Sequence, residues 1–258
     1  MKIALFLFTV LISLTSNAQQ RVIEDSIVYN DPTVAKGGKW VSGILLGGYY
    51  SNADSSVTNS DGIDIKTKQK YTQPGAEGFI GYSDFTLIGR YEKKNVTISV
   101  PNTSSSSSTT MKEDGHVYSV DLRYLAIPLQ QKYFVPYALL SYTTSHSGVE
   151  FNTYSNGTQK RNFNHAKGPG IGVGALIPIT DRYGVRVDIR QYQLKTYNTS
   201  NYSSAIESRN LEYRQVGSSA YYNLTDKMTM QLGATYAYLN NISNSNSLGL
   251  SFSVGVKF

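Results

Sequence analysis

The last eleven residues constrain the fold more than any other stretch of the chain. From Leu248 to Phe258, large apolar residues occupy every second position, and glycine, serine or lysine fill the positions between them. Strict alternation predicts a strand with one apolar face and one polar face. A length near eleven residues is what a tilted strand needs to cross a lipid bilayer. The alternative for this stretch alone is the edge or closing strand of a soluble sandwich or small barrel, where strands are usually shorter.

The N-terminus predicts export from the cytoplasm. Lys2 is followed by the apolar run Ile3 to Leu14 and then by Ser16-Asn17-Ala18, with small residues at the two positions that a signal peptidase reads. This is the pattern of a secretory signal peptide, so residues 1–18 are expected to be removed by cleavage after Ala18. An N-terminal membrane anchor is the alternative, but the apolar run is short for a span of about 30 Å.

Composition favours a barrel over a helical protein. The chain has no Cys, which excludes disulfides and lipid attachment through cysteine, and it carries 21 Tyr and 22 Gly. Period-2 strands rich in Tyr and Gly, with loops rich in Ser and Asn, are typical of β-barrels. The net charge of +6 comes from dispersed Lys and Arg, so no nucleic-acid surface is expected.

Between the two ends, strand-like and polar stretches alternate. Long polar stretches such as Ser51–Lys70 and Thr143–Lys167 follow the odd strands, and tight turns such as Ser83-Asp84 follow the even ones. Long outer loops, short inner turns and an even strand number are features of membrane barrels. We therefore expect an all-β fold, an antiparallel up-and-down transmembrane β-barrel over residues 38–258, with a short periplasmic leader over residues 19–37. One misjudged strand would change the count of ten to eight or twelve. The expected strands are 40–50, 71–82, 85–92, 117–127, 133–142, 168–179, 185–190, 211–222, 228–238 and 248–258.

Three features carry a family resemblance: the signal peptide, the hairpin from Ile127-Pro128-Leu129 to Pro136-Tyr137, and the strand that ends on Phe258. Together they resemble the small outer-membrane β-barrel proteins of Gram-negative bacteria, the OmpA-like and OmpW-like barrel superfamily. The resemblance implies location in the outer membrane and a barrel-only member without a periplasmic peptidoglycan-binding domain. It also implies a C-terminal signal for the barrel assembly machinery, made of Phe252, Val254, Val256 and Phe258.

The residues on the polar face of the expected strands predict a charged lumen. Buried charges must be paired or reached by water, so a balanced set favours an ion-pair network that fills the lumen over a selectivity ring of one sign. A barrel of about eight strands has a filled interior, and ten strands add only a little room. The expected network contains five acids and five arginines: Glu77, Glu92, Asp121, Asp188 and Glu212 with Arg90, Arg123, Arg186, Arg190 and Arg214.

Three histidines are the candidates for a catalytic or metal site at the outer rim: His116 near Asp114, His146 between Ser145 and Ser147 with Glu150 nearby, and His165. Barrels of this size include outer-membrane proteases and lipid A deacylases or acyltransferases. The Asp-x-His pairing of the proteases is missing, and the deacylases' His-x-Ser spacing fails because Gly148 follows His146 by two. Serine is too abundant for adjacency to indicate a triad. Without Cys, His-x-His or His-x3-His, no metal or cofactor is expected, and solvated histidines are favoured.

The sequence therefore predicts a monomeric, non-enzymatic outer-membrane barrel with a structural or surface-interacting role, in contact with outer-membrane lipid including lipopolysaccharide. Outer loops rich in Tyr, Ser and Asn are suited to stacking and hydrogen bonding with glycans or proteins. A narrow, porin-like channel for small solutes is the second interpretation. A rim enzyme of the lipid A deacylase or protease type is the third.

Overall fold

The computed structural model describes residues 31–35, 39–58, 64–101, 108–126, 134–151, 160–180, 182–200, 203–240 and 245–258. The expected signal peptide, most of the expected leader and the greater part of the hairpin turn after Ile127 lie outside these ranges. Their assignment stays a prediction. Among the described residues, no helix is long and apolar enough to cross a membrane.

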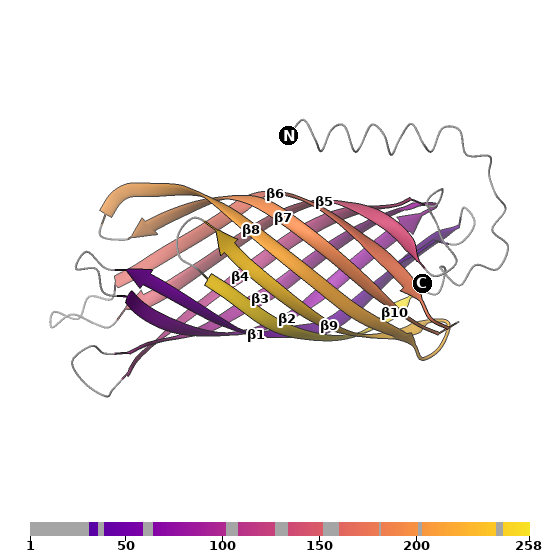
Figure 1. Ribbon diagram of the computed structural model, residues 1–258, viewed down its shortest axis with the longest axis horizontal. Coiled ribbons are helices and arrows are strands. Elements are labelled where there is room, and N and C mark those ends of the chain that lie inside the picture. Colours follow the sequence, from indigo (N-terminus) through magenta and orange to yellow (C-terminus); the bar gives the residue numbers. More distant parts are fainter. Residues whose placement is uncertain are drawn as a thin grey trace.

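Ten antiparallel strands form one closed barrel, as expected from the alternation of the sequence. Each strand pairs with its neighbours in the chain, and β1 closes the barrel against β10, with Gly43 opposite Lys257 and Asp54 opposite Asn246. All ten run obliquely around one long axis (Figure 1). The strands are β1 (Trp40–Thr58), β2 (Asp64–Tyr82), β3 (Phe85–Pro101), β4 (Ser108–Leu125), β5 (Val135–Phe151), β6 (Lys160–Pro178), β7 (Tyr183–Ser200), β8 (Ser203–Asn223), β9 (Met228–Asn240) and β10 (Ser245–Lys257).

The two ends of the barrel differ. At one end, which we call the short-turn end, β2 and β3 are joined by Ser83 and Asp84 alone, and Ser83 adopts a left-handed φ of 51°. The C-terminus lies at this end (Figure 1). There the backbone N–H of Phe258 donates to the carbonyl of Ser42 on β1, at 2.8 Å, so the final residue takes part in closing the barrel.

The strands are longer than the sequence analysis expected. β1 continues to Thr58 and β2 begins at Asp64, so much of the expected loop Ser51–Lys70 is paired strand. A tilted strand of 19 residues rises roughly 50 Å along the barrel axis, about twice the apolar height of an outer-membrane barrel. The prediction failed here because both faces of a strand beyond the lipid are polar, and the alternation that marks a membrane strand therefore ends with the lipid.

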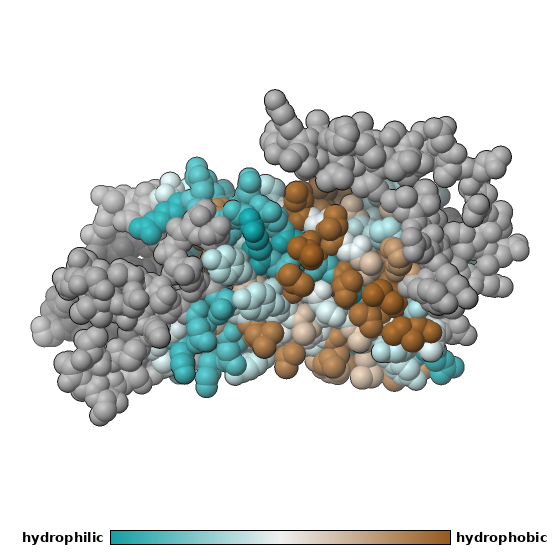
Figure 2. All heavy atoms as spheres, in the orientation of Figure 1, coloured by the Kyte–Doolittle hydropathy of each residue, from teal (hydrophilic) through white to brown (hydrophobic). Residues whose placement is uncertain are grey.

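An apolar belt surrounds the half of the barrel nearest the short turns. Figure 2 shows apolar residues over this half of the visible face and hydrophilic residues over the other half. The belt consists of outward side chains such as Ile44 and Leu46, and it includes the expected assembly-signal residues Phe252, Val256 and Phe258, all of them exposed. Aromatic residues border it at both interfaces, as in membrane barrels: Trp40, Tyr82, Phe85, Tyr183 and Tyr222 toward the short turns, and Tyr50, Tyr91, Tyr118, Tyr142 and Tyr236 toward the long loops.

Inside the belt, small residues alternate with large ones that fill the lumen. Leu45, Phe79 and Ile88 form an apolar cluster with Val41 packed against it. Gly43 leaves room for Phe79, since a Cβ at this glycine would lie 2.5 Å from the Phe79 ring. The inner wall formed by β1, β2 and β3 is therefore packed like a protein core.

Candidate functional site

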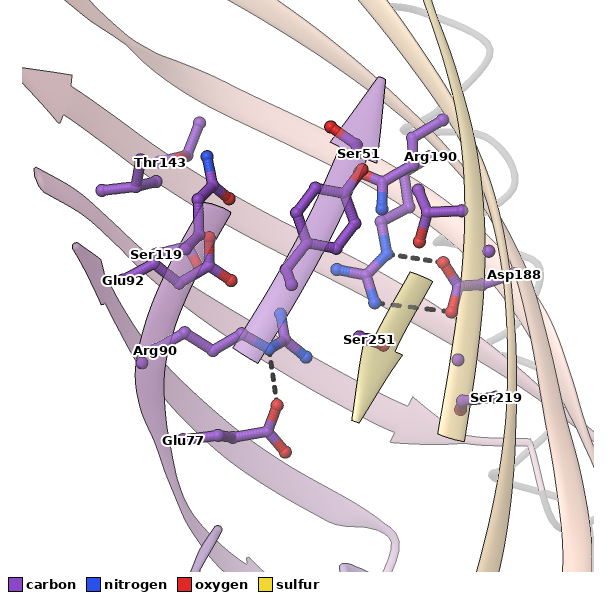
Figure 3. Close-up of a pocket in the computed structure, with 18 of the residues that line it drawn as sticks. Ser51, Glu77, Arg90, Glu92, Ser119, Thr143, Asp188, Arg190, Ser219 and Ser251 are labelled. Atoms are coloured by element: carbon purple, nitrogen blue, oxygen red, sulfur yellow. Dashed lines mark hydrogen bonds and ion pairs between the residues drawn. The ribbon is translucent and has the colours of Figure 1, made fainter. Parts of the chain in front are cut away.

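The lumen holds a cavity of about 580 Å³ lined by inward side chains. Its polar wall includes Ser119 and Thr143 on neighbouring strands and Ser219 and Ser251 on the far side, as Figure 3 shows. The cavity extends from the level of Ala53 to side chains deep in the short-turn half. Hydroxyl, carboxylate and guanidinium groups together make it a compartment suited to water and small polar solutes.

A network of ion pairs crosses the lumen, and its arginines line this cavity. Arg90 Nε lies 2.6 Å from Glu77 Oε2, and Arg90 Nη1 lies 2.6 Å from Asp121 Oδ2. The same Asp121 oxygen lies 2.7 Å from Arg190 Nη1, and Arg190 Nε lies 2.6 Å from Asp188 Oδ1. Asp121 thus joins arginines of β3 and β7, which are separated by three strands in the barrel order. The pairs of Arg90 with Glu77 and of Arg190 with Asp188 face each other in Figure 3.

Residues 31–35 form a second layer of contacts inside the barrel at the short-turn end. Asp31 Oδ2 lies 3.0 Å from Arg186 Nε, and Arg123 Nη2 contacts both Asp31 Oδ1, at 4.0 Å, and the hydroxyl of Thr33. The Thr86 hydroxyl donates to the carbonyl of Thr33 at 2.9 Å. We call residues 31–35 the plug segment, because these contacts hold it between β3, β4 and β7 inside the barrel.

Local hydrogen bonds shape the plug segment for this position. Asp31 Oδ1 accepts from the Thr33 backbone N–H at 2.9 Å, and the Val34 N–H donates to the Asp31 carbonyl at 3.1 Å, which makes a compact turn. Val34 then packs in an apolar cluster with Leu125, Val135, Tyr137, Leu139 and Leu176. The segment is therefore held by charge, hydrogen bonds and apolar packing together.

The structure brings together most of the residues that the sequence placed in the lumen. Glu77, Arg90, Asp121, Asp188 and Arg190 form the upper layer of ion pairs, and Arg123 and Arg186 hold the plug segment. Glu92 lines the cavity but forms no ion pair with a described residue. The sequence analysis did not include Asp31. The signal that could have found it is an Asp followed two positions later by Thr, the pattern of a side-chain-capped turn.

Two members of the expected network, Glu212 and Arg214, lie on the outer face of β8. Their predicted position in the lumen is wrong. Tyr213 and Gln215 line the cavity instead, so the inward parity of this strand is odd. Arg214 Nη2 lies 2.7 Å from Glu212 Oε1, and the Gln191 side chain donates to the same oxygen at 2.8 Å. The prediction failed here because charged residues must face inward only where the outer face meets lipid, and this part of β8 lies beyond the belt.

The three histidines also lie on the outer face, beyond the apolar belt. Their ring nitrogens contact aromatic and imidazole groups: His116 Nδ1 lies 2.8 Å from the Tyr91 hydroxyl, and His146 Nδ1 lies 3.0 Å from His165 Nδ1. Burial, with the nearby His146 and Lys167, lowers the pKa of His165. None of these contacts is the His–carboxylate pair that a hydrolytic triad requires.

Comparison with known proteins gives a family match and several similar folds. A family model described as the outer membrane protein beta-barrel domain matches residues 6–214. The outer membrane protease OmpT from Escherichia coli is 9% identical with a TM-score of 0.56, over 85% of this chain and 96% of that chain. OprG from Pseudomonas aeruginosa is 12% identical with a TM-score of 0.41, over 86% and 98%. Ail, the attachment invasion locus protein of Yersinia pestis, is 10% identical with a TM-score of 0.39, over 85% and 99%. No curated protein matches the sequence. The likeness to OmpT supports the barrel fold and nothing finer.

Proposed function

Because the chain belongs to the outer membrane protein beta-barrel domain family, we propose that it is an outer-membrane barrel with a closed lumen and a structural or surface-interacting role. The observation that carries this proposal is the pair of layers across the lumen. The upper layer links Asp121 to arginines on two separated strands, and the lower layer is the plug segment with Arg123 and Arg186. A solute that crossed the barrel would have to displace both.

The energetics of the two layers support closure. Separating one partner of a buried ion pair costs about 3–5 kcal/mol, because the other charge is left uncompensated. Asp121 is fully buried and shared by two arginines, and Asp31 is fully buried beside two more. Thermal fluctuation alone therefore opens such a lumen rarely. The long paired strands beyond the belt then serve as a rigid support for the outer loops.

Single-channel conductance in a planar bilayer tests this proposal. The parent protein is expected to be silent, whereas the double variant Arg123→Ala, Arg190→Ala, which removes one cation from each layer, is expected to show discrete openings. Arg214→Ala is the matched control, since it removes an arginine from the outer face, and it should stay silent. Steady conductance of the parent, or openings in the control alone, would contradict a closed lumen.

A narrow channel for small solutes is the second candidate, and the polar cavity of about 580 Å³ favours it. In this case the two layers form a constriction. The same recording distinguishes the candidates, because a channel conducts in the parent protein.

We further propose that the barrel is not an enzyme and functions as a monomer. The third interpretation, a rim enzyme, requires a nucleophile and an oriented base, and the contacts of His116, His146 and His165 with Tyr91 and one another do not supply them. Incubation of the folded barrel with a peptide library and with lipid A should leave both uncleaved. Specific cleavage that His146→Gln abolishes would restore the enzyme interpretation.

The monomer is tested separately. Light scattering of the folded barrel should give the protein mass of one chain.

Outer-membrane lipid is the partner we propose for the surface just beyond the belt. Exposed lysines point outward there: Lys70, Lys93, Lys167 and Lys195. Ammonium groups at headgroup level attract anionic lipid, and lipopolysaccharide carries phosphate groups. Changing all four to Gln should reduce the lipopolysaccharide that stays bound through purification, with Lys94→Gln, inside the barrel, as the control.

A further inference from the structure

Strand register places the three histidines in one row across the outer face. His116 on β4 is directly opposite His146 on β5, and His146 is directly opposite His165 on β6. The sequence separates them by 30 and 19 positions (116 to 146 to 165), so no spacing motif could reveal the row. Adjacent residues in such a row have Cβ atoms about 4.5–5.5 Å apart, close enough for neighbouring imidazoles to share one ligand.

His146 and His165 already face each other with their nitrogens. His146 Nδ1 lies 3.0 Å from Nδ1 and 3.1 Å from Nε2 of His165, and the ring centroids are 4.2 Å apart at an interplanar angle of 55°. In a metal-free pair of this kind, one neutral ring donates its N–H to the lone pair of the other. Both rings are exposed at the surface.

The nitrogen spacing matches that of two ligands of one metal ion. Imidazole nitrogens bind Zn²⁺ at about 2.0–2.1 Å, so two cis ligands lie about 2.9–3.4 Å apart for angles between 90° and tetrahedral. We propose that His146 and His165 form a surface site for a divalent transition-metal ion of the class that prefers imidazole, such as Cu²⁺, Ni²⁺ or Zn²⁺. Ca²⁺ and Mg²⁺, which require oxygen ligands, are excluded from it.

The third histidine is held apart from this pair. His116 stacks on Tyr91 with ring centroids 5.7 Å apart, and its Nδ1 lies 2.8 Å from the Tyr91 hydroxyl. Among the described residues, no group of three or more His, Asp or Glu side chains is arranged to hold a metal ion. Water therefore completes the shell around the two imidazoles, and the bound ion is exchangeable with the medium.

The charged neighbours of the pair on β6 and β7 are lysines, which are not ligands of the metal. Lys167 lies two positions from His165 on the same face of β6, and Lys195 is directly opposite Lys167 on β7. Burial, His146 and Lys167 lower the pKa of His165, which favours the neutral imidazole that metal ligation requires. The proton of the internal hydrogen bond moves to the solvent-facing nitrogen when the metal takes its place.

Cu²⁺ binding to the untagged, folded, full-length barrel tests the site. Electron paramagnetic resonance should show one bound Cu²⁺ per chain with nitrogen hyperfine structure, and titration calorimetry should give the same stoichiometry with Zn²⁺. His146→Gln and His165→Gln should each weaken binding by about tenfold or more. His116→Gln is the matched control from the same row, and it should bind within about twofold of the parent.

Each other result overturns the site. No stoichiometric binding by the parent, or equal binding by the parent and His146→Gln, shows that the facing pair holds no metal. A loss in His116→Gln as large as that in His165→Gln shows that the pair is not the binding unit. All four proteins should show the same change in gel mobility on heating, which reports a folded barrel, because the three side chains lie on its surface.

Discussion

Asp121 and Arg190 lie 69 positions apart in the chain, and across the lumen Asp121 Oδ2 is 2.7 Å from Arg190 Nη1. The same oxygen lies 2.6 Å from Arg90 Nη1. One carboxylate therefore links strands that share no backbone hydrogen bond. Because two guanidinium groups pair with it, loss of Asp121 should weaken both arms of the upper layer.

Changing Asp121 to Asn should destabilise the barrel by about 3–5 kcal/mol, since the fully buried carboxylate is the shared counter-ion of two partly buried arginines. Urea unfolding in lipid vesicles measures this as a lower midpoint. Glu212→Gln is the matched control: it also removes an acid that pairs with arginine, but Arg214 is 56% exposed, so a change of about 1 kcal/mol or less is expected. Equal effects of the two variants would contradict the role of burial.

The plug segment can be probed with a single cysteine, because the chain has none. Val34 is 3% exposed, so Val34→Cys should react slowly with a water-soluble maleimide. Adding Arg186→Ala removes an ion pair to Asp31 and should raise the labelling rate about tenfold or more, the ratio that corresponds to 1.4 kcal/mol. Thr225→Cys, in the exposed turn after β8, should label rapidly with or without Arg186. Fast labelling of Val34→Cys alone would show that the segment is not seated.

Two glycines distinguish the packed interior from the lipid face. A Cβ at Gly174 would lie 2.4 Å from both the Tyr137 ring and the Val187 carbonyl oxygen, whereas a Cβ at Gly89 meets nothing within 4 Å. Gly174→Ala should therefore cost about 1–3 kcal/mol by overpacking, and Gly89→Ala should be neutral or slightly stabilising. Unfolding midpoints measured side by side test the contrast, which fails if the two variants are equally stable.

The position of the membrane can be mapped with one arginine on β1. Leu46 is 63% exposed within the apolar belt, so Leu46→Arg should cost about 2–4 kcal/mol in a bilayer. Asp54 lies on the same face of the same strand but beyond the aromatic border at Tyr50, and Asp54→Arg should change stability by less than about 1 kcal/mol. Folding yield into vesicles provides the readout. A larger loss for Asp54→Arg would move the belt toward the long loops.

The barrel could be predicted from sequence because alternation reports directly on which face meets lipid. That signal was strong at Leu248–Phe258 and Gly168–Ile179, and the structure places both as β-strands. At Leu211–Arg214 the alternation of Leu211 and Tyr213 with Glu212 and Arg214 was clear, but this part of β8 lies beyond the belt, where the outer face meets water, so the charged residues face outward and the inward and outward residues were exchanged. Alternation also ends with the lipid, so the strand extension to Thr58 carried no signal.

The candidate sites depended on contacts that no local pattern contains. Asp31 belongs to the lumen because residues 31–35 lie inside the barrel, and its partners Arg123 and Arg186 are 92 and 155 positions away (31 to 123 and 31 to 186). The pairing of His146 with His165 depends in the same way on the register of β5 against β6. Sequence analysis found the arginines and the histidines but not Asp31, and strand pairing decided which of them meet.

The plug segment has a topological consequence for the life of the barrel. It sits at the open base of the wall, and only four positions separate Ala35 from the first residue of β1, Trp40. The segment is held by side chains of Thr86, Arg123 and Arg186, whereas the strands are held to one another by backbone hydrogen bonds. Loss of these side-chain contacts should therefore release the segment and leave the pairing of the barrel wall unchanged.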